Sequence, residues 1–570
     1  MLIAALSWTY QLFVILPFGF FFQTLWRKEK RRQGINCESF LITFLVGLAV
    51  ITSIASFFSL FINIGWQVHL ILLITAILMW VFLLKKKILG RIELIKFTHS
   101  MPQIISLGLL IFAISVVLLA STYEPANADT GIYHAQSIRW IETYKAVPGL
   151  ANLHTRLGYN SSWLLANALF SLSFLGIQSF HLLPSTLFFV CVIYFFGGLH
   201  ALLDGQKKLS DLIKAIYLIA AFLFLSNEIS SPGTDLPVTL IIWVISVEWI
   251  KLFENPSESV DRNFMALVLI SFFCVTIKLS SAPLLLLPLS YLFYQAKHKR
   301  LMHSIIFVGA SFLFIFIPYI SRNVIISGHL VYPGLSFDPV NVEWSVPMNI
   351  VERESKIIHW FALMPRVSFQ EFNELNWQTQ YKIWFYDQIP RHKAILIYVF
   401  VIPAVWVFLL VLKKWRTWIR ETPGYIFILF SMYSGILFWL FSAPSFRFGY
   451  GFLLATVTLS GAPIILQIIE FKKALFPVFK TILLVVSIVI CLKNFHNFLD
   501  NPPKFSQYLL PLDYPKYSTI PCEYGNFKLL CPAEYDACWY DPFPCGIRPN
   551  ENLFMRGEDY SEGFIQLTQK

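Results

Sequence analysis

The segment from residue 123 to residue 162 concentrates ionisable side chains in a chain that otherwise contains few of them. It lies between two long apolar runs and contains acidic, basic and imidazole groups: Glu124, Asp129, His134, Arg139, Glu142, Lys145, His154 and Arg156. Such groups beside apolar surface are typical of functional sites, because burial and neighbouring charges change their pKa values there. A carboxylate such as that of Asp129 could act as a general base that takes a proton from an attacking group.

Asp129 precedes a helical pattern. Tyr133, Ser137, Trp140 and Tyr144 follow at spacings of four, three and four residues and therefore share one face of a helix. The pattern predicts an amphipathic helix lying at the surface, with Asp129 at its start. Asp129 could equally be the N-cap of that helix, a structural role that needs no catalysis. From these residues alone both interpretations stay open.

The composition of the chain is that of a membrane protein. Of its 570 residues, 56% are hydrophobic and only 14% are charged, with a mean hydropathy of +0.63. Soluble proteins carry about 25% charged residues. Apolar runs long enough to cross a bilayer recur, and lipid cannot satisfy their backbone polar groups unless they are helical. We therefore expect an all-α polytopic membrane protein with about 14 transmembrane helices.

The formal charge of +11 does not indicate nucleic-acid binding, because the basic residues form short clusters beside apolar runs. In that position they indicate which loops lie on the inner side of the membrane. They predict an integral membrane protein with the N- and C-termini outside. Separately from this charge pattern, we expect the membrane to be a bacterial inner (plasma) membrane. A short apolar segment at 162–176 is expected to lie at the membrane surface. The predicted units are N-terminal helices with three spans at 1–103, a membrane core at 104–320 with an outside loop at 121–179, a long outside loop at 321–393, C-terminal spans at 394–493 and an outside tail at 494–570.

The tail contains a cluster of four cysteines: Cys522, Cys531, Cys538 and Cys545. Clustered cysteines outside the cell are typical of disulfides, so we expect two bridges that hold a small, irregular extension. Their spacing does not distinguish the three connectivities that four cysteines allow. A zinc site is the alternative, although the cluster lacks a C-x-x-C pair.

A family resemblance adds to this interpretation. The chain has an acidic residue in its first large outside loop, followed by an expected surface helix and by the apolar segment SSWLLANALFSLSFLG. It also has Lys278 in a short outer turn, the segment RNVIISGHLVYP from Arg322 to Pro333, and SAPSFRF around Arg447. Together these features resemble the membrane glycosyltransferases with the GT-C fold. The resemblance covers roughly residues 107–333 and the region of Arg447, and the first three spans have no counterpart in the smallest members.

The resemblance implies that a sugar is transferred from a polyprenyl-phosphate or polyprenyl-diphosphate carrier to a glycan, lipid or protein acceptor on the outer side of the membrane. Asp129 would be the general base. Lys278, Arg322 and Arg447 would bind the lipid phosphate, whose negative charge needs fixed cations. The alternative for these three cations is that they reach the membrane interface without binding a ligand. His134, Arg139 and Arg156 are further candidates for contact with substrate.

One departure concerns the second acid. Many GT-C enzymes have adjacent acidic residues in the first loop, whereas Asp129 is followed by Thr130. A second carboxylate would therefore come from Glu124 or from Asp235, which could also cap the next helix. No cofactor is assigned, and a divalent metal held by Asp129 and Asp235 stays open.

Two other functions remain alternatives. One is an oligosaccharide polymerase or ligase of related fold, which transfers a preassembled glycan. The other is a lipid or solute transporter. Transporters use charged residues near the middle of the membrane, whereas here the ionisable groups gather in loops and at the outer ends of spans.

Overall fold

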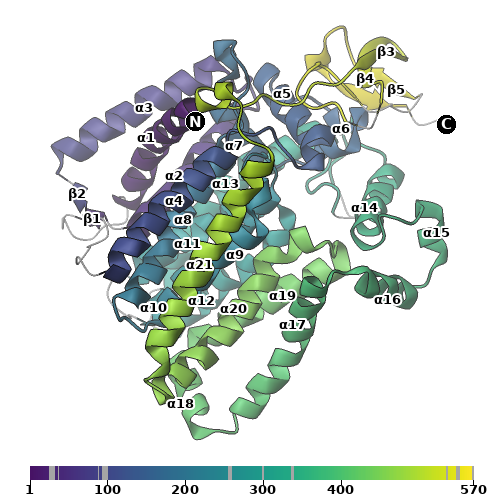
Figure 1. Ribbon diagram of the computed structural model, residues 1–570. Helices are drawn as coiled ribbons and strands as arrows, with labels where there is room; N and C mark the ends of the chain where they lie inside the picture. The colour runs from purple at the N-terminus through teal and green to yellow at the C-terminus, as the bar shows by residue number, and fades with distance from the viewer. Residues whose placement is uncertain are drawn as a thin grey trace.

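The computed structural model describes residues 1–24, 33–35, 37–87, 89–92, 101–254, 260–297, 301–334, 339–534, 537–546 and 552–567. Most of these residues form helices that pack side by side in a bundle (Figure 1). Two basic segments between apolar runs are affected: RKEKRR, from Arg27 to Arg32, lies outside the described residues, and so do residues 88 and 93–96 of the segment from residue 85 to residue 96.

Nine helices among the described residues are long and apolar enough to cross a membrane. They are α1 (Leu2–Thr24), α2 (Cys37–Phe58), α3 (Trp66–Lys85), α8 (Leu183–Leu203), α13 (Leu301–Ser327), α17 (Pro390–Leu409), α19 (Pro423–Ser442), α20 (Phe446–Phe471) and α21 (Leu475–Asp500). Within each, backbone donors and acceptors pair along the helix, which is what a hydrocarbon environment requires. This confirms the coarse expectation of helices that could span a membrane.

When the helices are judged by length and composition, fewer than the expected 14 or so qualify as membrane spans. Five further predicted spans are helical but do not qualify: α4 (Met101–Ala120), α9 (Leu209–Phe224), α10 (Asp235–Glu254), α11 (Val260–Ile277) and α12 (Leu286–Lys297). The helices α9, α11 and α12 are shorter than the nine, the described apolar part of α4 is short, and α10 carries four charged residues. Each predicted span therefore matches a helix, although within the described ranges nine of these helices are long and apolar enough to cross a membrane.

The innermost and outermost helices differ in burial. In α2 and α8, 78% of the most apolar stretch is buried, against 28% in α3 and α21 and 22% in α17. The exposed side chains of these outer helices include Leu78, Val407, Phe408 and Val489. Apolar residues on the outward faces of long helices are typical of lipid contact.

Shorter helices lie between the long ones. They are α5 (Ala135–Thr143), α6 (Leu150–Leu153), α7 (Ser162–Phe170), α14 (Met348–Leu363), α15 (Phe369–Glu374), α16 (Trp377–Asp387) and α18 (Lys413–Glu421). Single turns complete the helical structure: η1 (Thr130–His134), η2 (Thr155–Gly158), η3 (Ser173–Leu175), η4 (Ser226–Glu228), η5 (Leu279–Leu285), η6 (Phe505–Tyr508) and η7 (Tyr560–Glu562). The helices α14 to α16 project to one side of the bundle (Figure 1).

The fold is not purely α-helical. Two strands near the N-terminus pair in parallel, β1 (Gln33–Ile35) and β2 (Leu89–Ile92). The tail forms two antiparallel pairs: β3 (Thr519–Tyr524) with β4 (Phe527–Pro532), and β5 (Leu553–Met555) with β6 (Phe564–Gln566). The tail is thus more regular than expected, because its alternating apolar residues pack Phe527, Leu529 and Phe564 into one small core.

The two expected disulfides are present in the tail. They join Cys522 to Cys531 and Cys538 to Cys545, so each links neighbours in the sequence. This decides among the connectivities that the sequence left open and removes the zinc alternative for these four residues.

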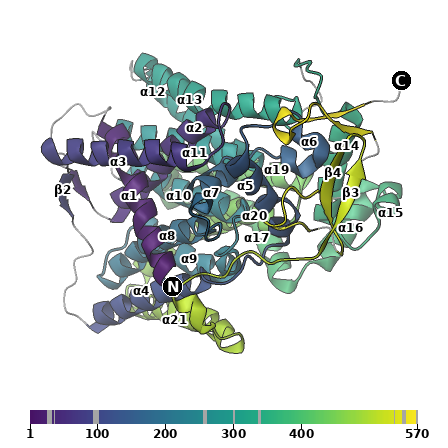
Figure 2. The ribbon, with the colours of Figure 1, turned by 90° about the horizontal axis from the view of Figure 1, so that it is seen from above.

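Two helices predicted at the surface are instead buried. All nine residues of α7 are buried, because the helix is apolar on every side and packs between α2, α5 and α11. In α5 seven of nine residues are buried. One side of α5 contacts α7, and the tail covers the other, as seen from above in Figure 2.

The tail is attached to α5 by polar contacts. The side-chain amide of Gln136 donates to the backbone oxygens of Trp539 and Pro542, at 2.9 and 3.1 Å. The backbone amide of Trp539 donates to the carbonyl of Gly131 at 2.8 Å. A Cβ atom at Gly131 would lie 2.7 Å from the indole of Trp539, so this close approach requires glycine. The C-terminal tail therefore supports the segment that begins at Asp129.

A tyrosine hydroxyl of the tail should contribute measurably to stability. Arg139 donates to the Tyr540 hydroxyl at 2.7 Å, and this hydroxyl donates to Glu142, which is only 8% exposed. Tyr540→Phe leaves the buried carboxylate with one donor fewer, which should cost about 1–3 kcal/mol of stability. The measurement is the Tm of the detergent-purified protein. Tyr508→Phe is the control, since Tyr508 is 50% exposed, and equal Tm values for the two variants would contradict the bridging role.

Candidate functional site

The carboxylate of Asp129 faces cations from distant parts of the chain. Asp129 immediately precedes η1 and makes no capping hydrogen bond with its side chain. Arg447 donates to its Oδ2, and Nη1 of Arg156 lies 3.6 Å from its Oδ1. The side chain of Asp129 is 14% exposed. Of the two interpretations that the sequence left open, the simple N-cap is therefore wrong for this side chain.

A second carboxylate lies on the other side of Arg447. Asp235 is the first residue of α10, and its Oδ2 is 3.7 Å from Nε of Arg447. Its Oδ1 is 2.5 Å from Nζ of Lys278, in the turn between α11 and η5. The ring of Phe448 lies beneath both cations, with its centroid 3.6 Å from Nζ of Lys278 and 4.8 Å from Cζ of Arg447.

These residues form one alternating row of charges, Arg156, Asp129, Arg447, Asp235 and Lys278, which we call the charge cluster. The helices that start or end here account for the convergence. Both α10 and α20 begin beside the cluster and α11 ends beside it, so helix ends bring residues from separate segments to one end of the bundle. Five of the predicted site residues are thereby brought together.

Asn127 and Glu228 extend the charge cluster, and sequence reasoning missed both. Asn127 Nδ2 donates to Glu228 Oε2 at 2.7 Å, and Arg447 Nη1 donates to Asn127 Oδ1 at 3.4 Å. Burial raises the pKa of the Glu228 carboxyl, although the hydrogen bond from Asn127 opposes this. A signal for Glu228 existed, because it lies in the polar loop NEISSPGTD that ends at Asp235, the candidate second acid.

Glu354 is a third missed acid. It lies on α14, is 4% exposed, and accepts hydrogen bonds from Thr155 at 2.7 Å and from the hydroxyl of Tyr159. Its Oε1 is 4.0 Å from Nε of Arg156, so this ion pair joins α14 to the charge cluster. Nothing in the sequence distinguishes Glu354 from the neighbouring Glu352.

The charges around Asp129 favour its ionised form. Burial alone raises the pKa of the Asp129 carboxyl, but the charges of Arg447, His134 and Arg156, together with the hydrogen bond from Arg447, lower it by more. The pKa therefore lies below its ordinary value, and Asp129 is a carboxylate at neutral pH. A residue that must accept a proton needs to be unprotonated, so this state suits a base.

His134 lies beside Asp129 and is almost fully buried. It is 2% exposed, its Nδ1 is 3.4 Å from the hydroxyl of Thr130, and among the described residues its Nε2 has no hydrogen-bond partner. Burial lowers the pKa of His134 to about 4, although Asp129 and Asp235 oppose this. His134 is thus a neutral imidazole at neutral pH.

His134 should make stability depend on pH. Between pH 6.5 and about 4 the unfolded chain protonates this imidazole and the folded protein does not. Because the unfolded state then binds more protons, stability falls as the pH is lowered through this window, by up to roughly 3 kcal/mol. The Tm difference between the wild type and His134→Gln should therefore shift in favour of the wild type as the pH rises. A difference that stays constant across the window would contradict this.

The other predicted site residues lie elsewhere. Arg322 is 6% exposed and donates to the hydroxyl of Ser59 at 3.1 Å, and no described carboxylate pairs with it. Arg139 belongs to the contact with Tyr540 in the tail. The side chain of Glu124 is exposed, and its backbone carbonyl accepts from Ser230. Asp235, and not Glu124, is therefore the second acid of the cluster.

A cavity of about 380 Å³, which we name the outer cavity, adjoins the charge cluster. Its walls come from the end of α14, from α16, and from the start of α17 and α20, and Arg447 lines it together with Arg366, Trp384 and His392. His392 stacks on Phe446 with ring centroids 3.8 Å apart, and its Nε2 is 3.0 Å from the Tyr450 hydroxyl. Arg447 thus belongs both to the cavity wall and to the charge cluster.

Ligands for a metal do not converge here. Within the described part of the chain, no three His, Cys, Asp or Glu side chains are grouped as metal ligands would be. Both carboxylates of the charge cluster are instead paired with Arg or Lys.

Comparison with known proteins gives one match. Residues 1–454 match the family model described as "Domain of unknown function (DUF8201)". No curated protein and no solved structure matches the chain.

Proposed function

Since the chain belongs to this family of unknown function, we propose its activity from the charge cluster: transfer of a sugar from a polyprenyl-phosphate-type carrier to an acceptor on the outer face of the membrane. Asp129 is the general base in this proposal. The observation that carries it is the position of Arg447, which pairs with Asp129 on one side and lines the outer cavity on the other.

The proposed step is a displacement at the anomeric carbon of the sugar. An acceptor hydroxyl forms the new bond to this carbon while the bond from the carbon to the phosphate oxygen breaks. The bonding electrons leave with the lipid phosphate, and the hydroxyl proton passes to the Asp129 carboxylate. Base assistance of this kind contributes about 10²–10⁴-fold to a rate.

The cations of the cluster suit the other half of this step. The departing phosphate gains negative charge, which fixed cations in a site shielded from water stabilise. Arg447 can hold two phosphate oxygens at once, and Lys278 supplies a second positive charge near it. Arg322, which lies apart from the cluster, is not needed for this role.

Arg447 also links carrier binding to the release of Asp129. Without a ligand, its guanidinium is shared between Asp129 and Asp235. A lipid phosphate in the outer cavity competes with Asp129 for the same N–H groups. In this proposal the base is therefore freed from its strongest hydrogen bond when the donor arrives.

The membrane architecture supports a lipid-linked donor. The N-terminus and the start of the tail lie beside the segment that leads to Asp129, since Ile3 donates to the carbonyl of Leu509 at 3.0 Å and Leu512 donates to that of Thr122 at 2.8 Å. Basic clusters at the other end of the bundle favour a cytoplasmic location for that end. The charge cluster, both termini and the tail are then outside.

The test is an assay on the purified full chain in lipid vesicles. A panel of polyprenyl-phosphate-linked sugars is supplied with glycan, lipid and protein acceptors, and both free polyprenyl phosphate and glycosylated acceptor are measured. We expect both products to form in equal amounts with one of the donors. Transport of intact donor across the vesicle membrane without release of polyprenyl phosphate would replace this proposal by a transporter.

A further inference from the structure

A second, larger cavity lies at the end of the bundle opposite the charge cluster. It has a volume of about 820 Å³, within the range of small-molecule sites. Leu466 and Glu470 line it near the end of α20, whereas Arg447 is near the start of that helix. At 1.5 Å per residue, the two places are about 30 Å apart, roughly the thickness of a hydrocarbon core.

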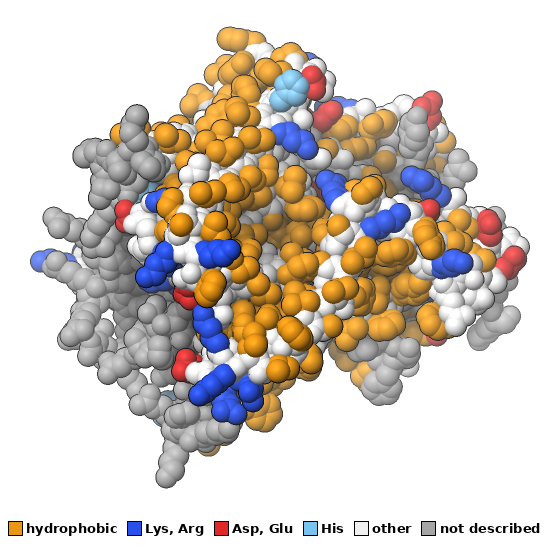
Figure 3. Space-filling view, turned by 60° about the horizontal axis from the view of Figure 1, so that its bottom comes forward, with side chains coloured by type: hydrophobic (Ala, Val, Ile, Leu, Met, Phe, Trp, Pro, Cys, Tyr) orange, Lys and Arg blue, Asp and Glu red, His pale blue; other side chains and the backbone are white. Residues whose placement is uncertain are grey.

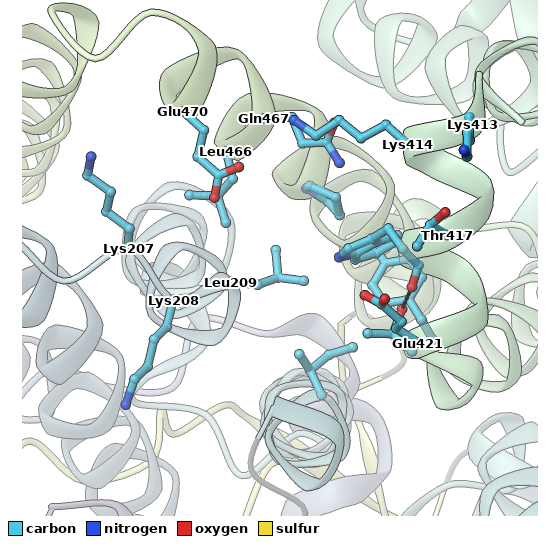
Figure 4. A pocket seen from close by; sticks show the side chains of 15 residues that line it. Lys207, Lys208, Leu209, Lys413, Lys414, Thr417, Glu421, Leu466, Gln467 and Glu470 are labelled. Carbon is cyan, nitrogen blue, oxygen red and sulfur yellow. Dashed lines mark hydrogen bonds between the residues drawn. The ribbon is translucent and has the colours of Figure 1, made fainter.

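The wall of this cavity is apolar inside and basic at its edge. Leu209, Ile250, Trp418, Pro463 and Leu466 provide the apolar part. Four lysines line the edge in two neighbouring pairs: Lys207, Lys208, Lys413 and Lys414. In Figure 4 the first pair lies on one side of the cavity and the second on the other, with Leu209 between them.

The four lysines are not neutralised by the protein. All four are exposed, and no carboxylate of the described residues forms an ion pair with any of them. The Nζ of Lys207 lies 4.6 Å from the centroid of the Phe476 ring, a contact that leaves its charge unpaired by any described carboxylate. Glu421 and Glu470 also line the cavity, so its lining carries an excess of positive charge. Basic side chains likewise gather on the face shown in Figure 3.

Aromatic residues place this cavity at the depth of lipid head groups. Trp415 and Trp418 of α18 pack against Trp406, with ring centroids 5.1 and 6.1 Å apart, and Trp418 packs on Tyr425 at 4.8 Å. Trp and Tyr collect where a membrane meets water. Next to them, Leu412 is 49% exposed and Phe427 is 47% exposed, as lipid-facing side chains would be.

We propose that this cavity binds the head group of an anionic phospholipid from the cytoplasmic leaflet. The phosphate lies among the four lysines, hydroxyls of the head group donate to Glu421 or Glu470, and the acyl chains follow the exposed apolar side chains beside α18. Basic cavities between helices on this side of membranes suit such lipids. The proposal concerns a different site from the charge cluster and does not depend on the reaction proposed there.

The test is native mass spectrometry of the detergent-purified full chain with added lipid. Lys413→Glu/Lys414→Glu reverses one pair of the edge lysines. Lys472→Glu/Lys473→Glu is the matched control, because it reverses two exposed lysines after α20 that do not line the cavity. We expect the wild type and the control to retain phosphatidylglycerol equally and the first variant to retain it at least roughly tenfold more weakly. Phosphatidylcholine should be retained weakly by all three proteins.

Three results would overturn the proposal. Equal loss of phosphatidylglycerol in both double variants would mean that general surface charge, and not this cavity, attracts the lipid. Equal retention of phosphatidylcholine by the wild type would exclude recognition of an anionic head group. Displacement of the lipid by inorganic phosphate would assign the cavity to a small anion. Lys413→Gln/Lys414→Gln repeats the measurement with a smaller change in charge, in case the reversal impairs folding.

Discussion

Asp129→Asn should abolish most sugar transfer, with a loss of about 10²–10⁴-fold in rate. Asparagine has nearly the same shape as aspartate but cannot accept the proton of the attacking hydroxyl. The pKa of Asp129 lies below its ordinary value, so the wild type keeps its base ionised at neutral pH and this loss is not masked by protonation. The measurement is single-turnover transfer from the lipid-linked donor, which separates the chemical step from donor binding.

Glu124→Gln is the comparison for this prediction, because Glu124 is an exposed acid in the same loop. It should retain the wild-type rate, and Tm values should show that both variants are folded. Full activity in Asp129→Asn would reject its role as the base. Loss of activity in Glu124→Gln alone would transfer that role to the other acid of the loop.

Arg447→Ala should weaken binding of the lipid-linked donor by about tenfold or more, and Arg447→Lys should weaken it less. A buried hydrogen bond to a charged group contributes roughly 1.5–3 kcal/mol, and lysine retains the charge but not the two-pronged contact. The measurement is donor affinity in vesicles, with Arg391→Ala as the control. Arg391 is an exposed arginine on α17 whose contact is with the ring of Phe224.

Arg447→Ala should also change the pH profile. The guanidinium lowers the pKa of Asp129, so its removal raises that pKa and should move the acidic limb of the rate profile to higher pH. A merely structural role for Arg447 would lower the amount of folded protein without moving this limb. Equal donor affinity in the wild type and both Arg447 variants would remove Arg447 from the phosphate site.

The charge cluster was foreseen in part. Asp129, Asp235, Lys278 and Arg447 could be chosen because each lies in a loop or at a helix end of an otherwise apolar chain. Their pairing could not be foreseen, because Arg447 and Asp129 are 318 residues apart in the sequence. Arg322 had the same sequence features as the others, yet it contacts Ser59. A position along the chain does not determine the direction in which a side chain points.

Burial of α5 was missed for a related reason. The pattern of α5 shows a polar and an apolar side, which predicts a surface helix when only one partner is considered. The tail supplies a second partner from more than 350 residues away, at Gln136 and Gly131. An amphipathic pattern indicates that the two faces of a helix lie in different environments, but it does not show which part of the protein or solvent each face contacts.

The sequence by itself predicted long apolar helices that could cross a membrane, two disulfides in the tail as the favoured use of its four cysteines, and ionisable residues gathered in loops and at helix ends. These are properties of composition and of local period, which a linear chain displays directly. Only the tertiary structure decided which acid faces which cation, which cysteines pair, and that one arginine is shared by the charge cluster and a cavity. Those depend on contacts between remote segments, whose geometry arises only when the helices pack.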